Sequence, residues 1–143
     1  MIAGAGLVIT GVLLKRLALP AGEADLQPAE HWAMPVVHDD VDVRHGPVLI
    51  QIRYRVPQED RAAFKKAIHK LAQSRRRDGA YSWGLMEQTD DPTALLEWFM
   101  VESWQEHMRQ HQRVSHADAE LQQAVLQYHQ GEEAPQVSHH IAI

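Results

Sequence analysis

The sequence predicts an α+β fold, with one four-stranded antiparallel sheet and helices on one of its faces. Two observations indicate this fold. Between residues 47 and 103 the spacing of apolar side chains changes from a strand period to a helix period, and then to two further strands. After residue 103 a helical region precedes a last strand. With 143 residues, 45% of them hydrophobic, the chain is long enough for one domain with a buried core.

The first strand is predicted at 48–55, where apolar and polar side chains alternate. Its apolar side chains should face the core, and Gln51 should face away. The first helix is predicted at 58–74, because apolar side chains recur there every three or four residues. Three arginines at 75–77 follow, in the charge order that a helix dipole favours at its carboxyl end.

A hairpin is predicted from the strands 81–88 and 95–102, which flank an Asp-Asp-Pro turn at 90–92. The second of these strands is apolar at nearly every position, which is typical of a strand covered on both faces. The helices of one small domain cover only one face of its sheet. We therefore expect a second copy of the chain to cover the other face, with Trp98 and Met100 in the contact.

The helical region begins at Ser103, because a serine followed three residues later by Glu106 is a capping box. A break near 114–115 should divide it into two helices, and a strand at 136–143 should complete the sheet. The order βαββαβ is that of a ferredoxin-like fold. We assign residues 47–143 to this domain.

The N-terminal segment 1–14 is apolar and uncharged, and Lys15 and Arg16 follow it. It is shorter than the roughly 20 residues that span a bilayer. A signal peptide would carry its charges before the apolar run, and a buried core helix is the remaining alternative. We interpret residues 1–19 as the end of a transmembrane helix that begins outside this chain, with its basic flank on the cytoplasmic side. Residues 20–46, with their repeated prolines, are predicted to be a linker.

Composition excludes several classes of function. The net charge is −5, so no nucleic-acid partner is expected, and the basic run 75–77 is interpreted as a helix end near an anionic membrane. There is no cysteine, which rules out disulfides, cysteine zinc sites and cysteine nucleophiles. No Ser-His-Asp order, phosphate loop or dinucleotide-binding glycine pattern is present.

Two histidines, His107 and His111, lie four residues apart on a predicted helix and so share a face. This spacing suits a metal, with His116 or His69 as a third ligand. The segment lacks the glutamate of a zinc-protease helix, however, and a histidine pair at this spacing is weak support for a metal. We interpret the pair as packed or solvated side chains and expect no metal.

His139 and His140 are neighbours on the last predicted strand, so one of them should face the covered side of the sheet. Trp83, Trp98 and Trp104 lie in or beside the predicted sheet. They are candidates for the wall of a pocket for a flat ligand. Packing in the core or at an interface is the alternative.

Four separated segments together resemble a known group of proteins: Gly-Pro-Val-Leu-Ile at 46–50, Arg-Asp-Gly-Ala-Tyr-Ser-Trp-Gly-Leu at 77–85, residues 101–111 and residues 131–139. The group is the cytoplasmic C-terminal domain of a bacterial branch of the major facilitator superfamily. This branch is the transmembrane secretion effectors, which include siderophore-exporter-like proteins. The resemblance implies that the chain is attached to the rest of a membrane transporter. It also implies that the domain lies on the cytoplasmic side of the bacterial inner membrane.

The domain itself resembles the antibiotic biosynthesis monooxygenases, or dimeric α/β barrels, which include cofactor-free quinone-forming monooxygenases and haem-degrading enzymes. The resemblance implies a site built from an asparagine on the first strand, a tryptophan and a helix histidine. Trp83 and His111 match the last two and are the candidate catalytic residues. Gln51 stands on the first strand instead of asparagine, and the chain contains no asparagine at all.

Three functions remain as alternatives. The first is a non-catalytic accessory or regulatory domain of an efflux transporter, self-associating through its sheet. The second is a small cofactor-free or haem-dependent monooxygenase, and the third is a ligand-sensing module for the exported compound. The missing asparagine favours the first over the second, and nothing separates the first from the third. We expect no cofactor, haem being the one alternative. The candidate ligand-binding residues are Gln51, Trp83, Trp98, His107 and His111.

Overall fold

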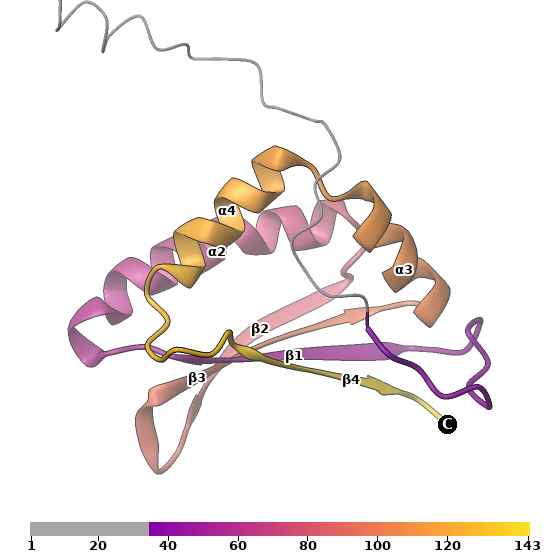
Figure 1. The fold of residues 1–143 in the computed structure, drawn as a ribbon, viewed down its shortest axis with the longest axis horizontal. Helices are drawn as coiled ribbons and strands as arrows, with labels where there is room; N and C mark the ends of the chain where they lie inside the picture. Colours follow the sequence, from indigo (N-terminus) through magenta and orange to yellow (C-terminus); the bar gives the residue numbers. More distant parts are fainter. Residues whose placement is uncertain (1–34) are drawn as a thin grey trace, which may run out of the picture.

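The computed structural model describes residues 35–143, so the predictions for residues 1–19 and for most of the linker lie outside the described residues. Figure 1 shows a sheet with all of the described helices on one side. The elements in chain order are β1 (Val48–Arg55), a short 3-10 helix η1 (Gln58–Asp60), α2 (Arg61–Arg77), β2 (Ser82–Gln88), β3 (Asp91–Val101), α3 (Trp104–Arg113), α4 (His116–Leu126) and β4 (Gln136–Ile141).

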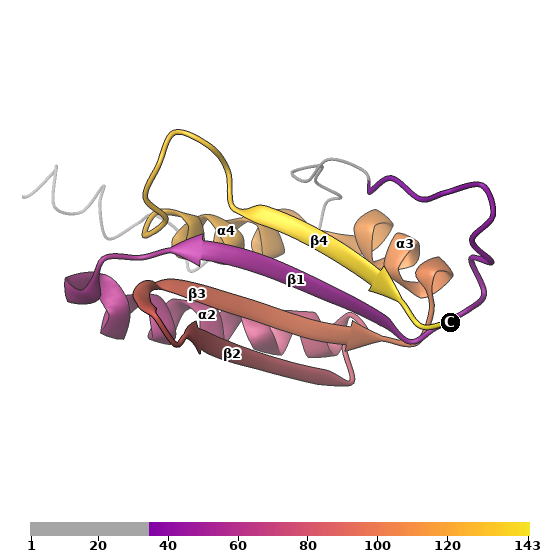
Figure 2. The same ribbon diagram turned by 90° about the horizontal axis from the view of Figure 1, so that it is seen from below.

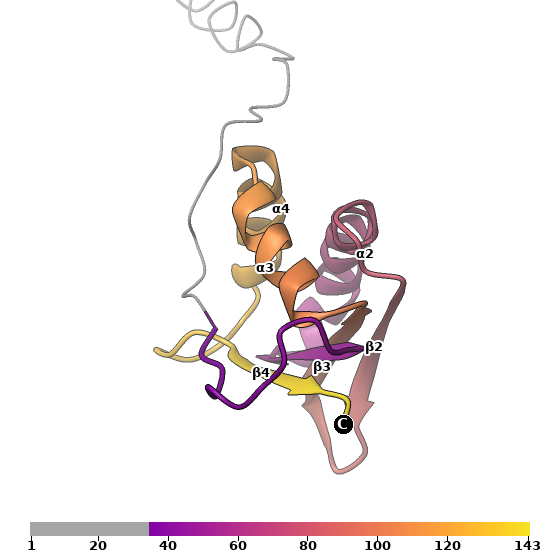
Figure 3. The same cartoon turned by 90° about the vertical axis from the view of Figure 1, so that its right-hand side faces the viewer.

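The sheet has the strand order β2-β3-β1-β4, and every neighbouring pair is antiparallel. Gln51 of β1 lies opposite Trp98 of β3 and Ser138 of β4, so these three side chains are on the same face of the sheet. Seen along the sheet, α2, α3 and α4 stand on the same side of it (Figure 3). The predicted α+β, ferredoxin-like architecture is confirmed.

The core lies between the sheet and α2, because the alternation along β1 places its apolar side chains on the helix side. Phe64, Ile68 and Leu71 of α2 pack onto this layer. Each such side chain, when fully buried, stabilises the fold by roughly 1.5–3 kcal/mol. The strand side of the core is formed by Val48, Ile50, Ile52, Tyr54, Leu95, Phe99 and Val101.

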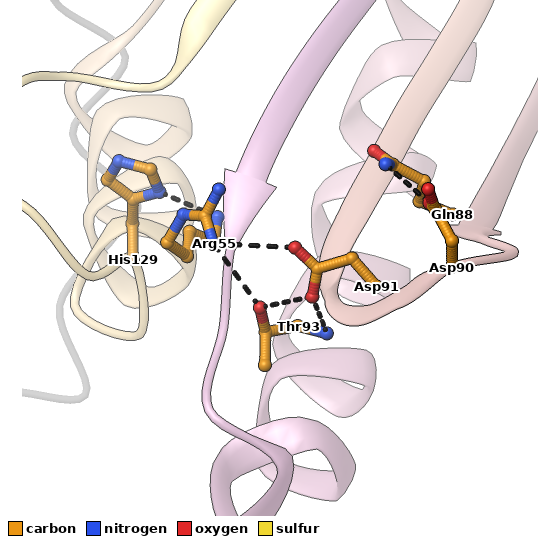
Figure 4. Close-up of polar contacts among 6 residues, drawn as sticks. All are labelled: Arg55, Gln88, Asp90, Asp91, Thr93 and His129. Carbon is orange, nitrogen blue, oxygen red and sulfur yellow. Dashed lines mark hydrogen bonds and ion pairs between the residues drawn. The ribbon is translucent and has the colours of Figure 1, made fainter.

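Several predicted boundaries differ from the structure by one to four residues, and two of these differences have an evident cause. β3 begins at Asp91, four residues earlier than predicted, and the hairpin turn is correspondingly tighter. Asp91 accepts hydrogen bonds from the backbone N–H (3.0 Å) and the hydroxyl (2.7 Å) of Thr93, and the guanidinium of Arg55 lies beside it at 3.4 Å (Figure 4). These contacts hold Pro92 in an extended chain. The first helix runs to Arg77, because two of its last arginines have partners inside the fold, as described below.

The break between the last two helices is confirmed at Val114 and Ser115. Ser115 caps α4 in a capping box with Asp118. The described part of the linker, 35–46, lies against α3. The carbonyls of His45 and Val43 accept hydrogen bonds from the N–H groups of Trp104 (3.3 Å) and Gln105 (2.8 Å). These two N–H groups would otherwise lack a partner at the start of the helix.

The second face of the sheet is not covered by any element among residues 35–143, as Figure 2 shows. Leu96, Trp98 and Met100 of β3 lie on this open face and are half-buried, and Met86 of β2 is 54% exposed. The Trp98 indole lies over Gly84, where an added Cβ would collide with its ring. In the same described part of the chain, no helix is long and apolar enough to cross a membrane.

Candidate functional site

The helix side of the sheet holds a cavity of about 850 Å³. Its apolar lining includes Ile50 and Ile52 of β1, Phe99 of β3 and Val137 of β4. The connection 131–135 between α4 and β4 also lines it, and Figure 2 shows this connection bowing away from the sheet. A cavity of this size holds a small organic molecule, since such sites measure roughly 300–1,000 Å³.

Three histidines gather at one side of this cavity. The ring of His107 lies 4.8 Å from that of His111, one turn along α3, and 4.9 Å from that of His139 on β4. Trp104 closes the group, with its ring 5.7 Å from His107 and 5.5 Å from His139. His107 is only 4% exposed, and the buried Nε2 atoms of His107 and His139 have no hydrogen-bond partner. A buried polar atom without a partner is uncommon in folded proteins.

Two of these imidazoles, those of His107 and His139, are held in the neutral form. Burial, and after it the neighbouring His111 and His139, lowers the pKa of His107 to about 3. Burial is also the main reason why the pKa of His139 is lowered. At neutral pH they therefore act as hydrogen-bonding groups and not as charges.

The two sequence candidates for a third metal ligand are not part of this cluster. His69 packs its ring 5.4 Å from that of Trp83, and His116 is the first residue of α4. The third histidine of the cluster is His139, which faces the helices as one of the pair His139–His140 was predicted to do. Among residues 35–143, no three potential ligands converge on a point that could hold a metal ion.

A buried ion pair lies behind the cavity. Glu97 is completely buried and accepts hydrogen bonds from Tyr54 (3.1 Å), Trp83 Nε1 (2.9 Å) and Arg75 (3.3 Å and 3.4 Å). The Arg75 guanidinium stacks 4.8 Å from the ring of Phe99 and also lines the cavity. Burial opposes the positive charge of Arg75, but Glu97 offsets this and the pKa of Arg75 is raised.

The interpretation of the arginine run as one membrane-facing group is therefore wrong for Arg75. Its side chain points into the fold, and only the next two arginines lie further out. Arg76 lies over Trp83 at 5.9 Å, and Arg77 pairs with Asp118 at 2.7 Å. The sequence indicates this arrangement, because Glu97 occupies a core-facing position of an apolar strand and a buried carboxylate requires a cationic partner.

The five candidate ligand-binding residues do not form one site. Only His107 and His111 line the cavity. Gln51 and Trp98 lie on the open face of the sheet, where the Ser138 hydroxyl donates to Gln51 Oε1 (3.4 Å). Trp83 lies on the helix side, but its N–H is taken by Glu97. Gln51, Trp83 and His111 are thus not assembled as the resemblance to monooxygenases implies. The cavity residues that sequence reasoning did not select include Arg75, Phe99, Val137 and His139.

This sheet, with its helices and cavity on one face, defines the class of ferredoxin-like folds found in antibiotic biosynthesis monooxygenases. The structure resembles a protein from Bordetella bronchiseptica assigned to that group, with 19% sequence identity and a TM-score of 0.58, over 68% of this chain and 98% of that chain. A Caulobacter crescentus protein with the same assignment has 14% identity and a TM-score of 0.59, over 71% of this chain and 93% of that chain. A third protein of the group, from Nitrosomonas europaea, has 13% identity and a TM-score of 0.57, over 72% of this chain and 96% of that chain. At these identities the likeness concerns the fold alone.

The family is shown by the sequence. The chain belongs to the transmembrane secretion effector family, whose model matches residues 1–143. A comparison with curated proteins finds no match.

Proposed function

We propose that this chain is a cytosolic accessory domain of a major facilitator superfamily efflux transporter of the bacterial inner membrane. In this proposal the domain binds a small, mainly apolar compound in its cavity and regulates the transporter without catalysing a reaction. The family match supports the association with a transporter, since it includes the apolar N-terminal residues as well as the folded domain. The residues before the fold would connect it to the membrane.

The cavity is the observation that carries the proposal. Its apolar lining suits a hydrophobic compound, and the neutral His107 and His139 supply hydrogen bonds without a charge to desolvate. Binding is favoured over catalysis because Gln51 lies on the opposite face of the sheet from His111. A difference of even about 1 Å in placement is costly for catalysis, and here the groups lie on different faces.

An uncharged dye tests the proposal on the full chain. N-phenyl-1-naphthylamine fluoresces strongly in apolar sites, and we expect saturable binding to the unaltered protein. Val137→Trp should project a large ring from β4 into the cavity and weaken this binding. His140→Trp is the matched control, because it places the same side chain three residues along β4 on the open face. Equal dye binding by the two variants would show that the dye does not occupy the cavity, and the proposal would then be withdrawn.

We also propose that a second copy of the chain covers the open face of the sheet. The half-buried Trp98 and the exposed Met86 support this, since they form an apolar surface that water meets in the single chain. The Trp98 indole N–H is buried without a partner on the same face.

A further inference from the structure

We propose that the cavity has a separate polar subsite, and that its ligand is an uncharged compound with an apolar body and a carbonyl group at one end. The subsite is a second, smaller cavity enclosed by α2, α3 and α4. This inference rests on the proposed function, because the body of the ligand would occupy the large cavity. It adds the chemical class of the ligand and the residues that select it.

The two cavities lie next to each other. The smaller one has a volume of about 50 Å³, which is room for one small group, since a water molecule in the liquid takes about 30 Å³. Most of the residues that line it are polar or charged, and they include Ser74, Asp78, Gln110, Asp118 and Gln122. The residues that line both cavities are Arg75, Phe99, His107 and His111.

The wall of the small cavity contains a buried hydrogen-bond donor that nothing satisfies. Gln110 is 9% exposed, and its Oε1 faces the Nδ1 atom of His107 at 3.4 Å. Its Nε2 atom is buried and has no partner. An unpaired buried amide is destabilising. A ligand group that accepts a hydrogen bond from this N–H would therefore bind with a favourable free energy.

Arg75 offers donors at the boundary of the two cavities. A guanidinium has five N–H donors, and the contacts of Arg75 with Glu97, at 3.3 Å and 3.4 Å, are longer than a strong charge-assisted pair. Glu97 also receives hydrogen bonds from Trp83 and Tyr54. The side chain of Arg75 is 17% exposed and lines both cavities. Because Gln110 and Arg75 both offer N–H donors, the ligand group that binds here should be a hydrogen-bond acceptor.

The charges around the small cavity indicate that this acceptor is uncharged. The charged side chains that line it are Asp78, Asp118 and Arg75, and the charge of Arg75 is already balanced by Glu97. Asp118 is fixed by hydrogen bonds from Ser74 (2.5 Å) and Arg77 (2.7 Å). A carboxylate on the ligand would therefore be placed beside two acidic side chains, which is unfavourable in a partly buried site. A ketone or amide carbonyl accepts the same hydrogen bonds without this repulsion.

Two dyes that differ only in a ketone test the inference on the full chain. The first is 6-propionyl-2-(dimethylamino)naphthalene, whose emission moves to longer wavelength when its carbonyl accepts a hydrogen bond. The second is 2-(dimethylamino)naphthalene, which has the same ring without the ketone. Gln110→Leu should weaken binding of the ketone dye about tenfold, which is the loss of one buried hydrogen bond. It should also shift the bound emission to shorter wavelength and leave the affinity for the second dye within about twofold.

The same variant gives a readout that a purely structural role would not. Gln110→Leu removes an unsatisfied amide, so we expect it to raise the melting temperature of the protein without dye while weakening the ketone dye. Gln112→Leu is the matched control on the exposed side of α3 and should change neither property. Gln110→Met removes the same donor with a side chain of similar length and should repeat the result if the leucine variant misfolds.

Each outcome distinguishes this inference from the function on which it rests. Equal weakening of both dyes, or of neither, would overturn the polar subsite and leave ligand binding in the large cavity intact. If the unaltered protein binds neither dye, both the subsite and the proposed function are rejected. The subsite would also be overturned if the bound ketone dye had the same emission wavelength in the unaltered protein and in Gln110→Leu.

Discussion

At the residue scale, His107 is the clearest case of a side chain whose ionisation is set by its surroundings. It is buried between two other histidines, and its pKa falls from 6.5 to about 3. In the unfolded chain the same imidazole takes up a proton near its ordinary pKa. The folded protein therefore holds fewer protons than the unfolded one between these two values, and acid favours unfolding.

We expect the free energy of unfolding to fall as the pH drops from about 6.5 towards 3. His107 alone should contribute up to about 1.4 kcal/mol for each pH unit. Urea unfolding at pH 7, 6, 5 and 4 measures the slope. His107→Phe should flatten it, whereas His140→Gln, on the exposed face of β4, should leave it as it is. An unchanged slope in the His107 variant would mean that this histidine is protonated in the folded protein.

The second case at this scale is the buried ion pair of Glu97 and Arg75, which joins β3 of the sheet to α2. Removing one partner leaves an unpaired buried charge, which costs about 3–5 kcal/mol. We expect Arg75→Met to lose about this much and Arg75→Met with Glu97→Gln to lose clearly less. Chemical unfolding of the two single variants and the double variant gives the coupling energy. Additive losses would show that the pair does not interact across the core.

At the scale of elements, the strands and helices could be predicted from the sequence wherever one periodicity prevails. The alternation along β1 and the spacing of Phe64 and Ile68 are local signals, and both elements are confirmed. The start of β3 was missed because Asp91 and Thr93 bond to each other across Pro92, and Pro92 reads as a turn residue in the sequence alone.

The candidate site was less predictable, because its members come from different elements. The pair His107–His111 could be predicted from helical spacing, but their neighbour His139 reaches them only when β4 pairs with β1. From the sequence, Arg75 is interpreted as part of an exposed basic run, because nothing in the sequence shows that its partner Glu97, on another element, lies beside it. Sequence spacing shows which residues share a face of one element, but not which faces meet.

The linker segment 35–46 gives an element-scale prediction. A chain that begins at residue 35 should keep cooperative unfolding and become more soluble, because it loses the apolar residues 1–14. A chain that begins at Gly46 should also fold but with lower stability. It loses the carbonyls that accept from Trp104 and Gln105 at the start of α3, which costs about 1 kcal/mol. Thermal unfolding of both shortened chains checks this, and loss of the transition in the first would place residues 1–34 within the core.

At the scale of the whole molecule, the monooxygenase likeness and the arrangement of the side chains point to different functions. The fold is that of the monooxygenase group, but Gln51 and Trp83 lie on opposite faces of the sheet. We therefore expect no oxygen consumption with phenolic or anthrone-like substrates. Haemin titration should give a weak Soret shift that His111→Ala hardly changes, with no ring opening after a reductant is added. Tight, His111-dependent binding followed by haem loss would establish the enzyme instead.

The last prediction concerns the assembly of the molecule through its open face. β3 carries core residues on one face and Leu96, Trp98 and Met100 on the other, so a single chain leaves an apolar surface in water. We expect the chain of residues 35–143 to sediment at twice its own mass. Trp98→Asp should place a charge in the centre of the contact and give a monomer or an aggregate. Val36→Asp, at an exposed position away from the open face, is the control and should remain a dimer. A soluble monomer of the unaltered chain at high micromolar concentration would show that the open face is not an interface between copies, and Trp98 would then need another partner.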